Sequence, residues 1–444
     1  EQVDAGYVTR SREVFFSGAA VVETEDFQHG VPTVVENSRT LRRGREVLIS
    51  SYGGLAPESM TYDAFGQIVQ MVSPTGAVTK FIYNAARQLV RTVDHDGQAT
   101  TYTYYGPTHA AAGLRWTVTN PKGEVTETIY NSRGQTIETT GTGTYRVTWG
   151  YNALGETTEM RTYRSGTTGD LTQWSYHAGS GLLLEKTDAA GKKTVYTYNK
   201  SGKVATRSFA RLTGTPSVAV KTTYGYNAYG EPTSRTYNDG LTTNVSFTRD
   251  RLGRPTQIVD ASGTRTMLYS DLGDTPDNTT YSGASTPLVG RELSISHDYR
   301  GITGYQIDSG AAHGNIRYGA DGTIRTISDL PNLTVGPNDS YHAFTYKQGT
   351  NVLERVETGY GSSGTILTRN QYSDRMRRLA GIETKNAAGT VISRHGYTLD
   401  AAGRRIRAIR ENGQVWDYAY NSRGEVTSGV KSFQNGTAMP GHSF

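Results

Sequence analysis

Apolar and polar side chains alternate along most of the chain with a period of two, in runs of about six residues between turn signals. In residues 124–130, Val125, Glu127 and Ile129 share one face of the expected strand, and the other face carries Thr and Tyr. Residues 414–420 place three aromatic side chains on one face. Neither face is fully apolar, which favours an extended sheet or hollow wall over a two-layer sandwich. No run shows a helical period over a useful length.

A unit of the form Tyr-(Asn/Asp)-x-x-Gly recurs along the chain. With 30 Tyr and 52 Gly among 444 residues, chance places Gly four residues after Tyr about 3.5 times. Eight copies, six of them with Asn or Asp after the Tyr, begin at Tyr62, Tyr130, Tyr151, Tyr198, Tyr226, Tyr269, Tyr318 and Tyr420. Neighbouring copies, including degenerate ones, are often 21 or 22 residues apart. The chain is therefore expected to be a repeat array.

A second glycine, seven residues upstream of many copies, ends a turn signature of its own, as in Asp94-His-Asp-Gly97 and Asn120-Pro-Lys-Gly123. Asx or Ser at the first position caps such a turn, and Gly at the fourth adopts the left-handed conformation that closes it. Each unit then holds two tight turns and two strands, which predicts antiparallel hairpins that continue as a meander.

The residues predicted to matter are structural. We expect the glycines to close turns and each repeat tyrosine to stack on its counterpart in the next repeat. These predicted turn and stacking residues are Tyr62, Gly66, Gly76, Gly97, Gly123, Tyr130, Gly134, Tyr151, Gly155, Gly191, Tyr198, Gly202, Tyr226, Gly230, Gly253, Gly263, Gly413, Tyr420 and Gly424.

The length exceeds what a single compact core supports, so several parts are expected. Residues 1–55 are predicted to be divergent N-terminal repeats or a cap, and residues 56–273 a repeat array. Residues 274–345 are predicted to be irregular repeats with longer loops, and residues 346–444 to continue the array past the C-terminal end.

The composition excludes several kinds of site and segment. The chain has no Cys, a net charge of only +5 and no run of 18 apolar residues. Disulfides, thiolate metal sites and a membrane-spanning helix are therefore not expected. The first residues, Glu1-Gln2-Val3, contain neither Met nor a leader, so we expect a processed product or a piece of a longer protein.

No catalytic, cofactor or metal residue is predicted. The nine His lack zinc-site spacing, and Asp94-His-Asp96-Gly97 lacks the distal acidic ligand of a calcium loop. No nucleophile elbow, phosphate loop or recognisable carboxylate pair is present. We therefore predict that the protein is not an enzyme and needs no cofactor.

Two basic clusters are present, Arg39, Arg42, Arg43 and Arg45, and Arg404, Arg405, Arg407 and Arg410. With aromatic side chains nearby, the second cluster could hold single-stranded nucleic acid. We favour an arginine-lined strand face paired with Glu and Asp, so no nucleic-acid partner is predicted. The arrayed Tyr and Trp leave binding of surface glycans open.

The units resemble the Tyr-Asp (YD) repeats of the RHS (rearrangement hotspot) family, whose pattern is Tyr-Asp-x-x-Gly-Arg-Leu with an upstream Gly. Residues 62–84 and 249–265 match it closely, and the resemblance covers residues 60–430, least clearly at 274–345. Members include bacterial RHS toxins, the B and C components of insecticidal toxin complexes, and the shell of teneurins. The resemblance implies an all-β array of antiparallel hairpins, forming a long curved or spiral sheet wound into a hollow shell.

The resemblance also implies a function. We predict a non-enzymatic shell segment of a secreted or surface-located bacterial protein that encloses and delivers a C-terminal toxin or effector. Its partners would be that cargo domain or a protein of the delivery machinery. The alternative is a surface adhesin or fibre module that binds glycans or protein partners. Two departures stand out: Asn replaces Asp in most turns, and no Asp-Pro dipeptide of a self-cleavage element is present.

Overall fold

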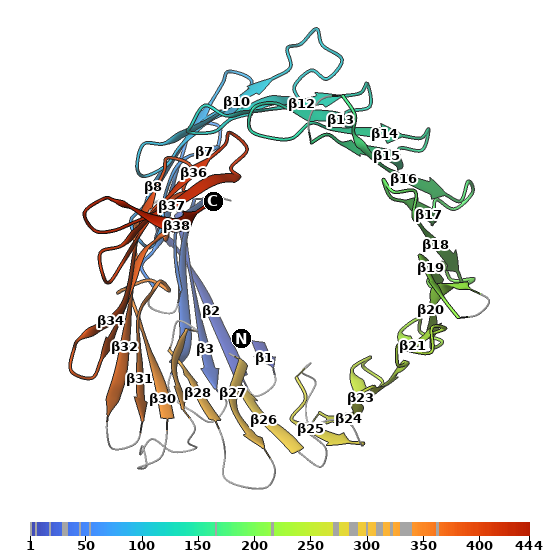
Figure 1. The fold of residues 1–444 in the computed structure, drawn as a ribbon. Coiled ribbons are helices and arrows are strands. Elements are labelled where there is room, and N and C mark those ends of the chain that lie inside the picture. The colour runs from blue at the N-terminus through green and yellow to red at the C-terminus, as the bar shows by residue number, and fades with distance from the viewer. Residues whose placement is uncertain are drawn as a thin grey trace. The chain divides into compact units, whose positions relative to one another are not determined.

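The fold was determined as a computed structural model. It describes residues 2–4, 7–16, 19–28, 34–43, 46–52, 55–164, 167–214, 217–269, 275–283, 292–298, 301–307, 314–319, 323–328, 340–360 and 364–444. All regular elements in these residues are β-strands, which alternate with short turns along the chain (Figure 1).

The first strands are β1 (Gln2–Asp4), β2 (Tyr7–Phe16), β3 (Ala19–Gln28), β4 (Val34–Arg43), β5 (Glu46–Tyr52), β6 (Glu58–Tyr62), β7 (Ile68–Val72), β8 (Val78–Tyr83), β9 (Leu89–Val93), β10 (Ala99–Tyr104), β11 (Arg115–Thr119) and β12 (Val125–Tyr130). The middle strands are β13 (Thr136–Thr140), β14 (Val147–Tyr151), β15 (Thr157–Thr162), β16 (Asp170–Tyr176), β17 (Leu183–Thr187), β18 (Lys193–Tyr198), β19 (Val204–Thr213), β20 (Val218–Tyr226), β21 (Pro232–Tyr237), β22 (Val245–Arg249), β23 (Pro255–Asp260), β24 (Gly263–Leu268), β25 (Asn278–Ser282), β26 (Glu292–Asp298) and β27 (Gly301–Ile307). The last strands are β28 (Gly314–Tyr318), β29 (Ile324–Ser328), β30 (Ser340–Tyr346), β31 (Leu353–Tyr360), β32 (Thr365–Ser373), β33 (Leu379–Asn386), β34 (Val391–Leu399), β35 (Arg405–Arg410), β36 (Val415–Tyr420), β37 (Val426–Ser432) and β38 (Ala438–Ser443).

Within each unit the strands pair antiparallel with their neighbours in sequence, as β17 with β18 and β18 with β19. The predicted all-β array of antiparallel hairpins is confirmed. Because the strands are only five or six residues long in most repeats and the turns are tight, the chain folds back every ten or eleven residues. One long sheet results.

The chain divides into two units. Unit 1 contains Glu1–Glu127, Gly141–Thr144 and Gly314–Phe444, and unit 2 contains Thr128–Thr140 and Tyr145–His313. Unit 1 thus has two arms from opposite ends of the sequence, which we call the N-terminal and C-terminal arms. The chain leaves the N-terminal arm, passes through unit 2 and returns as the C-terminal arm.

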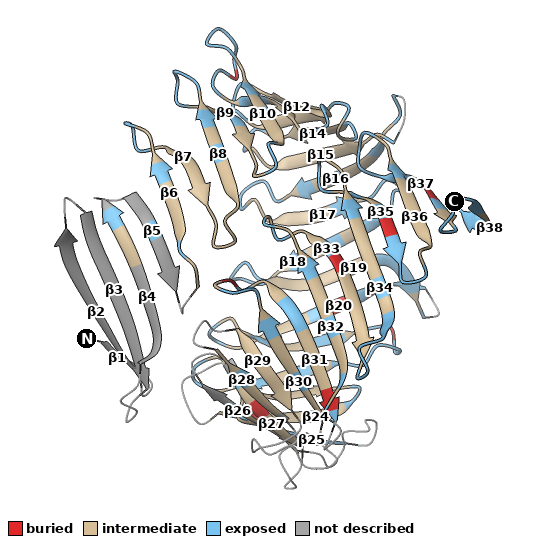
Figure 2. Ribbon diagram, turned by 90° about the vertical axis from the view of Figure 1, so that its left-hand side faces the viewer, coloured by how far each residue is buried: buried red, intermediate tan, exposed pale blue. Residues whose placement is uncertain are grey.

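The sheet has almost no core. The buried hydrophobic residues of the described chain are Ala111, Val220, Met267 and Ala408, and most strand residues are half-buried (Figure 2). The accessible surface is 26429 Å² for a mass of 48.4 kDa. A compact monomer of that mass exposes about 16,600 Å². Both faces of the sheet therefore remain largely in contact with solvent, as the mixed polarity of the strand faces predicts.

The division into four sequence segments stays a prediction. In residues 1–55 the backbone forms β1–β5, with β2, β3 and β4 each 10 residues long. In residues 274–345, most of the two expected loops lies outside the described residues. No helix in the described part of the chain is long and apolar enough to cross a lipid bilayer.

Candidate functional site

Turns on the two edges of the sheet share one backbone geometry. In the turn at Asn131, the N–H of Gly134 donates to the Asn131 carbonyl at 3.0 Å, and the Asn131 N–H donates to the Gln135 carbonyl at 2.9 Å. The Asn131 side-chain oxygen accepts from the N–H groups of Arg133 and Gln135. This arrangement is a type I turn closed by a left-handed residue.

We call turns that follow a repeat tyrosine Tyr turns, and those between them alternate turns. Because consecutive strands are antiparallel, all Tyr turns lie along one edge of the sheet, the Tyr-turn edge, and all alternate turns lie along the other, the alternate edge. Within a turn, the Asx is position one, the glycine position four and the next residue position five.

Positions one and five form a matched pair. In most turns with Asn at position one, its amide donates to an acid or amide at position five, as from Asn152 to Glu156 at 2.6 Å. In three Tyr turns position one is Asp and its carboxylate accepts from arginine at position five, as Asp250 does from Arg254 at 2.8 Å. In these turns, Asn at position one stands with Glu or Gln at position five and Asp stands with Arg, whereas Asp63 with Gln67 and Asn199 with Lys203 depart from this pattern. Sequence inspection missed this pairing, although both positions are visible in each repeat.

Repeat tyrosines lie at the end of the strand before a Tyr turn and fasten that strand to an earlier one. The Tyr198 hydroxyl donates to the Leu183 carbonyl at 2.7 Å, and the Tyr151 hydroxyl donates to the Thr136 carbonyl at 2.7 Å. Tyr226 and Tyr420 make equivalent bonds. None of these four rings stacks on another tyrosine in the described chain. These four tyrosines make the hydroxyl bond where stacking was expected, and the bond satisfies a backbone carbonyl at the end of a strand.

The other two predicted tyrosines sit at the same place in their repeats. Tyr62 ends β6 and donates its hydroxyl to the Met60 sulfur at 3.5 Å. Tyr130 ends β12. Cationic side chains lie over the rings of several repeat tyrosines. The guanidinium carbon of Arg254, for example, lies 4.3 Å from the centroid of the Tyr269 ring. Aromatic stacking does occur elsewhere, as between Trp416 and Tyr418.

The predicted glycines all have positive φ values, between 72° and 114°. Those at φ 72–90° occupy position four of a turn, where an L-residue is strained. Gly263 differs, because Asp260 pairs directly with it across a two-residue turn. A Cβ at Gly263 would clash with the carbonyl oxygen of Ser282. Glycine is required at position 263 because a neighbouring strand approaches closely, and not because the turn contains a bulge.

The two arms of unit 1 meet along a line of contacts that we call the seam. The alternate edge of the N-terminal arm lies against the Tyr-turn edge of the C-terminal arm, and the contacting residues are about 280 to 300 positions apart. The Ala56 N–H donates to the Gly349 carbonyl at 2.6 Å. Further along, the Thr75 hydroxyl donates to the Arg375 carbonyl, and Arg378 binds the Asp96 carboxylate.

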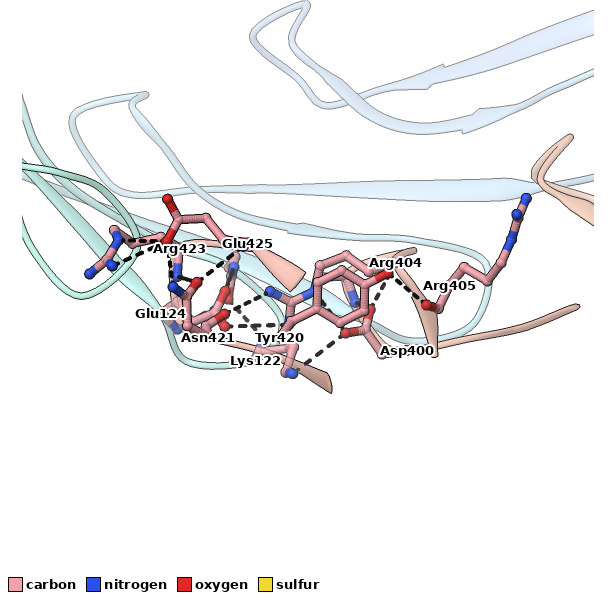
Figure 3. Close-up of polar contacts among 11 residues, drawn as sticks. Lys122, Glu124, Asp400, Arg404, Arg405, Tyr420, Asn421, Arg423 and Glu425 are labelled. Carbon is pink, nitrogen blue, oxygen red and sulfur yellow. Dashed lines mark hydrogen bonds and ion pairs between the residues drawn. The ribbon is translucent and has the colours of Figure 1, made fainter. Parts of the chain in front are cut away.

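Arg404 is the centre of the seam (Figure 3). Its guanidinium binds Asp400 of its own turn at 2.8 Å and Glu124 of the other arm at 3.4 Å. The Lys122 ammonium lies 3.4 Å from the Asp400 carboxylate, so positive and negative groups alternate across the seam. The Arg404 guanidinium carbon also lies 5.1 Å from the centroid of the Tyr420 ring. The Asp400, Glu124 and Arg404 side chains are only 10–15% exposed.

Electrostatics at the seam favour charged carboxylates. Burial alone would raise the pKa of Asp400, but the N–H and the guanidinium of Arg404 outweigh burial and lower this pKa below its ordinary value. Burial also raises the pKa of Asp374, but the Arg378 guanidinium outweighs burial and leaves this pKa below its ordinary value. The seam is thus held by ionised groups at neutral pH.

The arginines of the second basic cluster are mostly engaged by neighbouring side chains. Besides Arg404, the Arg407 guanidinium binds both carboxylate oxygens of Asp417, at 2.6 and 3.0 Å. The Arg405 guanidinium lies 3.6 Å from the centroid of the Tyr397 ring. In the first cluster, Arg45 lies outside the described residues, and of the others only Arg42 has a described side chain, which is exposed. Among described residues, no group of three or more His, Asp or Glu is placed to hold a metal ion.

Comparison with known protein families identifies the repeats. The model of the RHS repeat matches residues 62–94 and 226–266. These two segments are RHS repeats. Both segments contain a Tyr turn with its paired positions one and five, which the preceding contacts define. No curated protein matches the chain at a significant level.

A solved structure has a similar fold. The chain is similar to a chain of the Photorhabdus luminescens Tc holotoxin pore, with a TM-score of 0.50 and 13% sequence identity. The match covers 95% of this RHS-repeat chain and 26% of the toxin chain. It is also similar to the TcdB2-TccC3 crystal structure, with a TM-score of 0.42, 12% identity and coverage of 96% and 30%. This RHS-repeat chain thus spans about a quarter of the toxin chain.

Proposed function

We propose that this chain is part of the wall of an RHS-type shell that encloses a C-terminal toxin or effector and presents it to a delivery machine. The wall acts by containment and not by catalysis. The seam carries the proposal, because it joins the turn-lined margins of two courses of the repeat strip and so closes the gap between them within unit 1. An enclosing wall needs such lateral closure between successive courses of hairpins.

Two further observations support containment. The described residues form a sheet with little core, which suits a thin partition with solvent or cargo on both faces. The likeness to a chain of a Tc holotoxin supports the same kind of wall at the level of fold. We further propose a bacterial secreted or surface location, since the related structures are toxin-complex components.

Containment is tested with a protease-sensitive cargo. An unstructured reporter peptide is fused after Phe444 in the full-length protein context, and its cleavage by an added protease is timed. A closed seam should slow cleavage relative to the free peptide, and Arg404→Glu, which places three acids together, should remove that protection. The matched control is Arg423→Glu, because Arg423 is an arginine of the same arm that pairs with its neighbour Glu425. Equal cleavage in all three proteins would contradict the proposal.

Glycan binding is the second candidate function. Trp116 is 42% exposed, and its ring lies 5.7 Å from that of Tyr105 in a stacked pair that continues to His109. Such a flat aromatic surface suits the apolar face of a sugar ring. Screening the chain on a glycan array, with Trp116→Ala as the comparison, tests this role. Absence of any glycan signal that depends on Trp116 would remove it.

A further inference from the structure

The seam contains an apolar contact as well as charges, and methionine supplies it. Met376 is at position three of its Tyr turn, is half-buried, and lines a hollow together with Met71 and Phe81 of the N-terminal arm. Met60 lies directly opposite Met71 in the pairing of β6 with β7, on the same face of the sheet. Three of the six Met residues of the chain therefore gather at one stretch of the seam.

Contacts between the two arms hold the turn of Met376 on both sides. The Thr75 hydroxyl donates to the carbonyl of Arg375, the residue before Met376. Two residues after Met376, the Arg378 guanidinium binds the Asp96 carboxylate. Because these contacts hold the turn against the N-terminal arm, the Met376 side chain is kept at the hollow. A chemical change in that side chain therefore acts directly on the contact between the arms.

The backbone of the Met376 turn is strained. Arg377, at position four, has a φ of 63°, whereas glycine occupies this position in most Tyr turns. Among the non-glycine residues that the structure describes, only Arg87 also has a positive φ. A residue with a side chain is disfavoured in this left-handed conformation. The seam contacts oppose relaxation of the turn, so weakening them allows it to relax.

The hollow is open to small solutes. Its volume is about 270 Å³, several times the volume of a water molecule in the liquid, which is about 30 Å³. Hydrogen peroxide is only slightly larger than water and can enter it. Met71 and Met376 line this hollow and are half-buried, so a peroxide can reach their thioethers. Met267, on β24 of unit 2, is by contrast only 8% exposed.

Oxidation would change the character of the contact. The thioether of methionine is apolar and flexible and fills irregular space. A peroxide transfers one oxygen atom to the sulfur, so that the O–O bond breaks, the sulfur becomes a sulfoxide and the peroxide is reduced to water. The sulfoxide oxygen accepts hydrogen bonds, which the apolar ring of Phe81 cannot donate.

Hydrogen-bond donors for the sulfoxide would have to come from the seam or from solvent. The Thr75 hydroxyl, which also lines the hollow, has one proton and gives it to the Arg375 carbonyl across the seam. A sulfoxide therefore draws water into the apolar contact or competes for a hydroxyl that joins the arms. Both outcomes weaken the attachment of the strained turn.

We propose that Met71 and Met376 form an oxidation-sensitive site, and that their conversion to sulfoxides by a peroxide opens the seam at this turn. Reduction by a thiol-dependent sulfoxide reductase reverses the step: the oxygen leaves as water, and two thiols are joined in a disulfide. The proposal concerns the contact between the two arms of unit 1 and stands whether or not the wall encloses a cargo.

Peroxide treatment of the whole chain tests the proposal in two measurements. Peptide mass spectrometry should show one added oxygen at Met71 and at Met376 before any at Met267. Hydrogen exchange then reports on the seam, because the Ala56 N–H donates to the Gly349 carbonyl across it. Exchange in the peptide that contains Ala56 should accelerate about fivefold or more after oxidation. Treatment with methionine sulfoxide reductase and a thiol should restore the original rate.

Conservative variants separate this site from general oxidative damage. Met71→Leu combined with Met376→Leu keeps an apolar contact without a thioether, so exchange should match the parent and should no longer respond to peroxide. Met160→Leu combined with Met439→Leu is the matched control, and it should respond as the parent does. Met376→Gln places a polar amide at the hollow and should accelerate exchange without peroxide. Circular dichroism confirms that each variant is folded.

The contradicting outcomes are equally specific. Methionines of the hollow that stay unoxidised, or exchange that is unchanged once they carry oxygen, would overturn the proposal. A double leucine variant that still responds to peroxide would place the sensitive group elsewhere. Exchange that stays fast after the sulfoxides have been reduced would show damage outside the hollow and would also refute the proposal.

Discussion

The guanidinium of Arg404 lies 3.4 Å from the carboxylate of Glu124, a residue 280 positions earlier in the chain. Arg404→Ala would remove the guanidinium that the poorly exposed Asp400 and Glu124 share, and Lys122 would still lie 3.4 Å from Asp400. Breaking a largely buried pair on one side costs about 2–4 kcal/mol. We expect the urea midpoint of unit 1 to fall accordingly. Arg423→Ala is the control, since its exposed pair should contribute less than about 0.5 kcal/mol; equal midpoints would contradict the central role of Arg404.

Acid should weaken the seam. The pKa of Asp400 is lowered in the folded protein, so this carboxylate stabilises the fold above its unfolded pKa of about 3.9. That contribution is lost as pH falls through the lower folded value. Asp400→Asn preserves the turn, because Asn caps other turns, but removes the ion pairs. Melting temperatures of wild type and variant should differ at pH 7 and converge below pH 4; a difference independent of pH would count against this assignment.

The pairing of turn positions one and five can be tested by exchange. Asn152→Asp brings a second carboxylate against Glu156 and should destabilise the protein by about 1–2 kcal/mol. Adding Glu156→Arg recreates the pair seen at Asp250 and Arg254 and should restore most of the loss. Thermal melting of the single and double variants measures the coupling. Additive losses would show that the two positions act independently.

The hydroxyl of Tyr198 should stabilise the fold through its hydrogen bond, apart from the packing of the aromatic ring. Tyr198→Phe removes the donor to the Leu183 carbonyl and should cost about 0.5–1.5 kcal/mol. Tyr229→Phe loses a hydroxyl on a 90% exposed side chain and should stay within about 0.5 kcal/mol. Chemical denaturation distinguishes the two. Similar losses would mean that the bond at Tyr198 is not responsible.

Gly202 tests backbone strain alone. Its φ is 72°, and a Cβ at this position would meet no atom within 4 Å. Gly202→Val should therefore cost about 1–3 kcal/mol through conformation and not through collision. Gly106 has equal space and no positive φ, so Gly106→Val should be nearly neutral in the same melting experiment. A Gly202 variant that melts like the parent would refute the strain argument.

The local part of this fold was predictable from sequence. Hairpins follow from Asx and Gly spacing within five residues, and the strands follow from alternation over six. The hydroxyl bond of Tyr198 was missed because its acceptor is a backbone carbonyl, which has no sequence signature. The matched Asn152 and Glu156 were visible in the sequence, but only the structure shows that the pair acts together.

The seam was not predictable, for a physical reason. Glu124 and Arg404 meet only because the intervening hairpins return the chain to a particular register, and small changes of twist in each hairpin accumulate over that distance. The sequence shows the basic cluster at Arg404–Arg410 and predicts that it pairs with acids. The acid that Arg404 reaches across the seam could not be chosen among 41 Asp and Glu residues.

Glycine-to-tyrosine repeats of this kind can ordinarily be duplicated or lost one at a time, because each contacts only its neighbours. The bridge between Glu124 and Arg404 removes that freedom. Inserting a single hairpin between them would displace every downstream charged group by about one strand pair, roughly 10 Å. Groups of like charge would then face each other across the seam. The number of hairpins between these two residues is therefore fixed by the bridge, and an insertion would keep it only if both margins changed together.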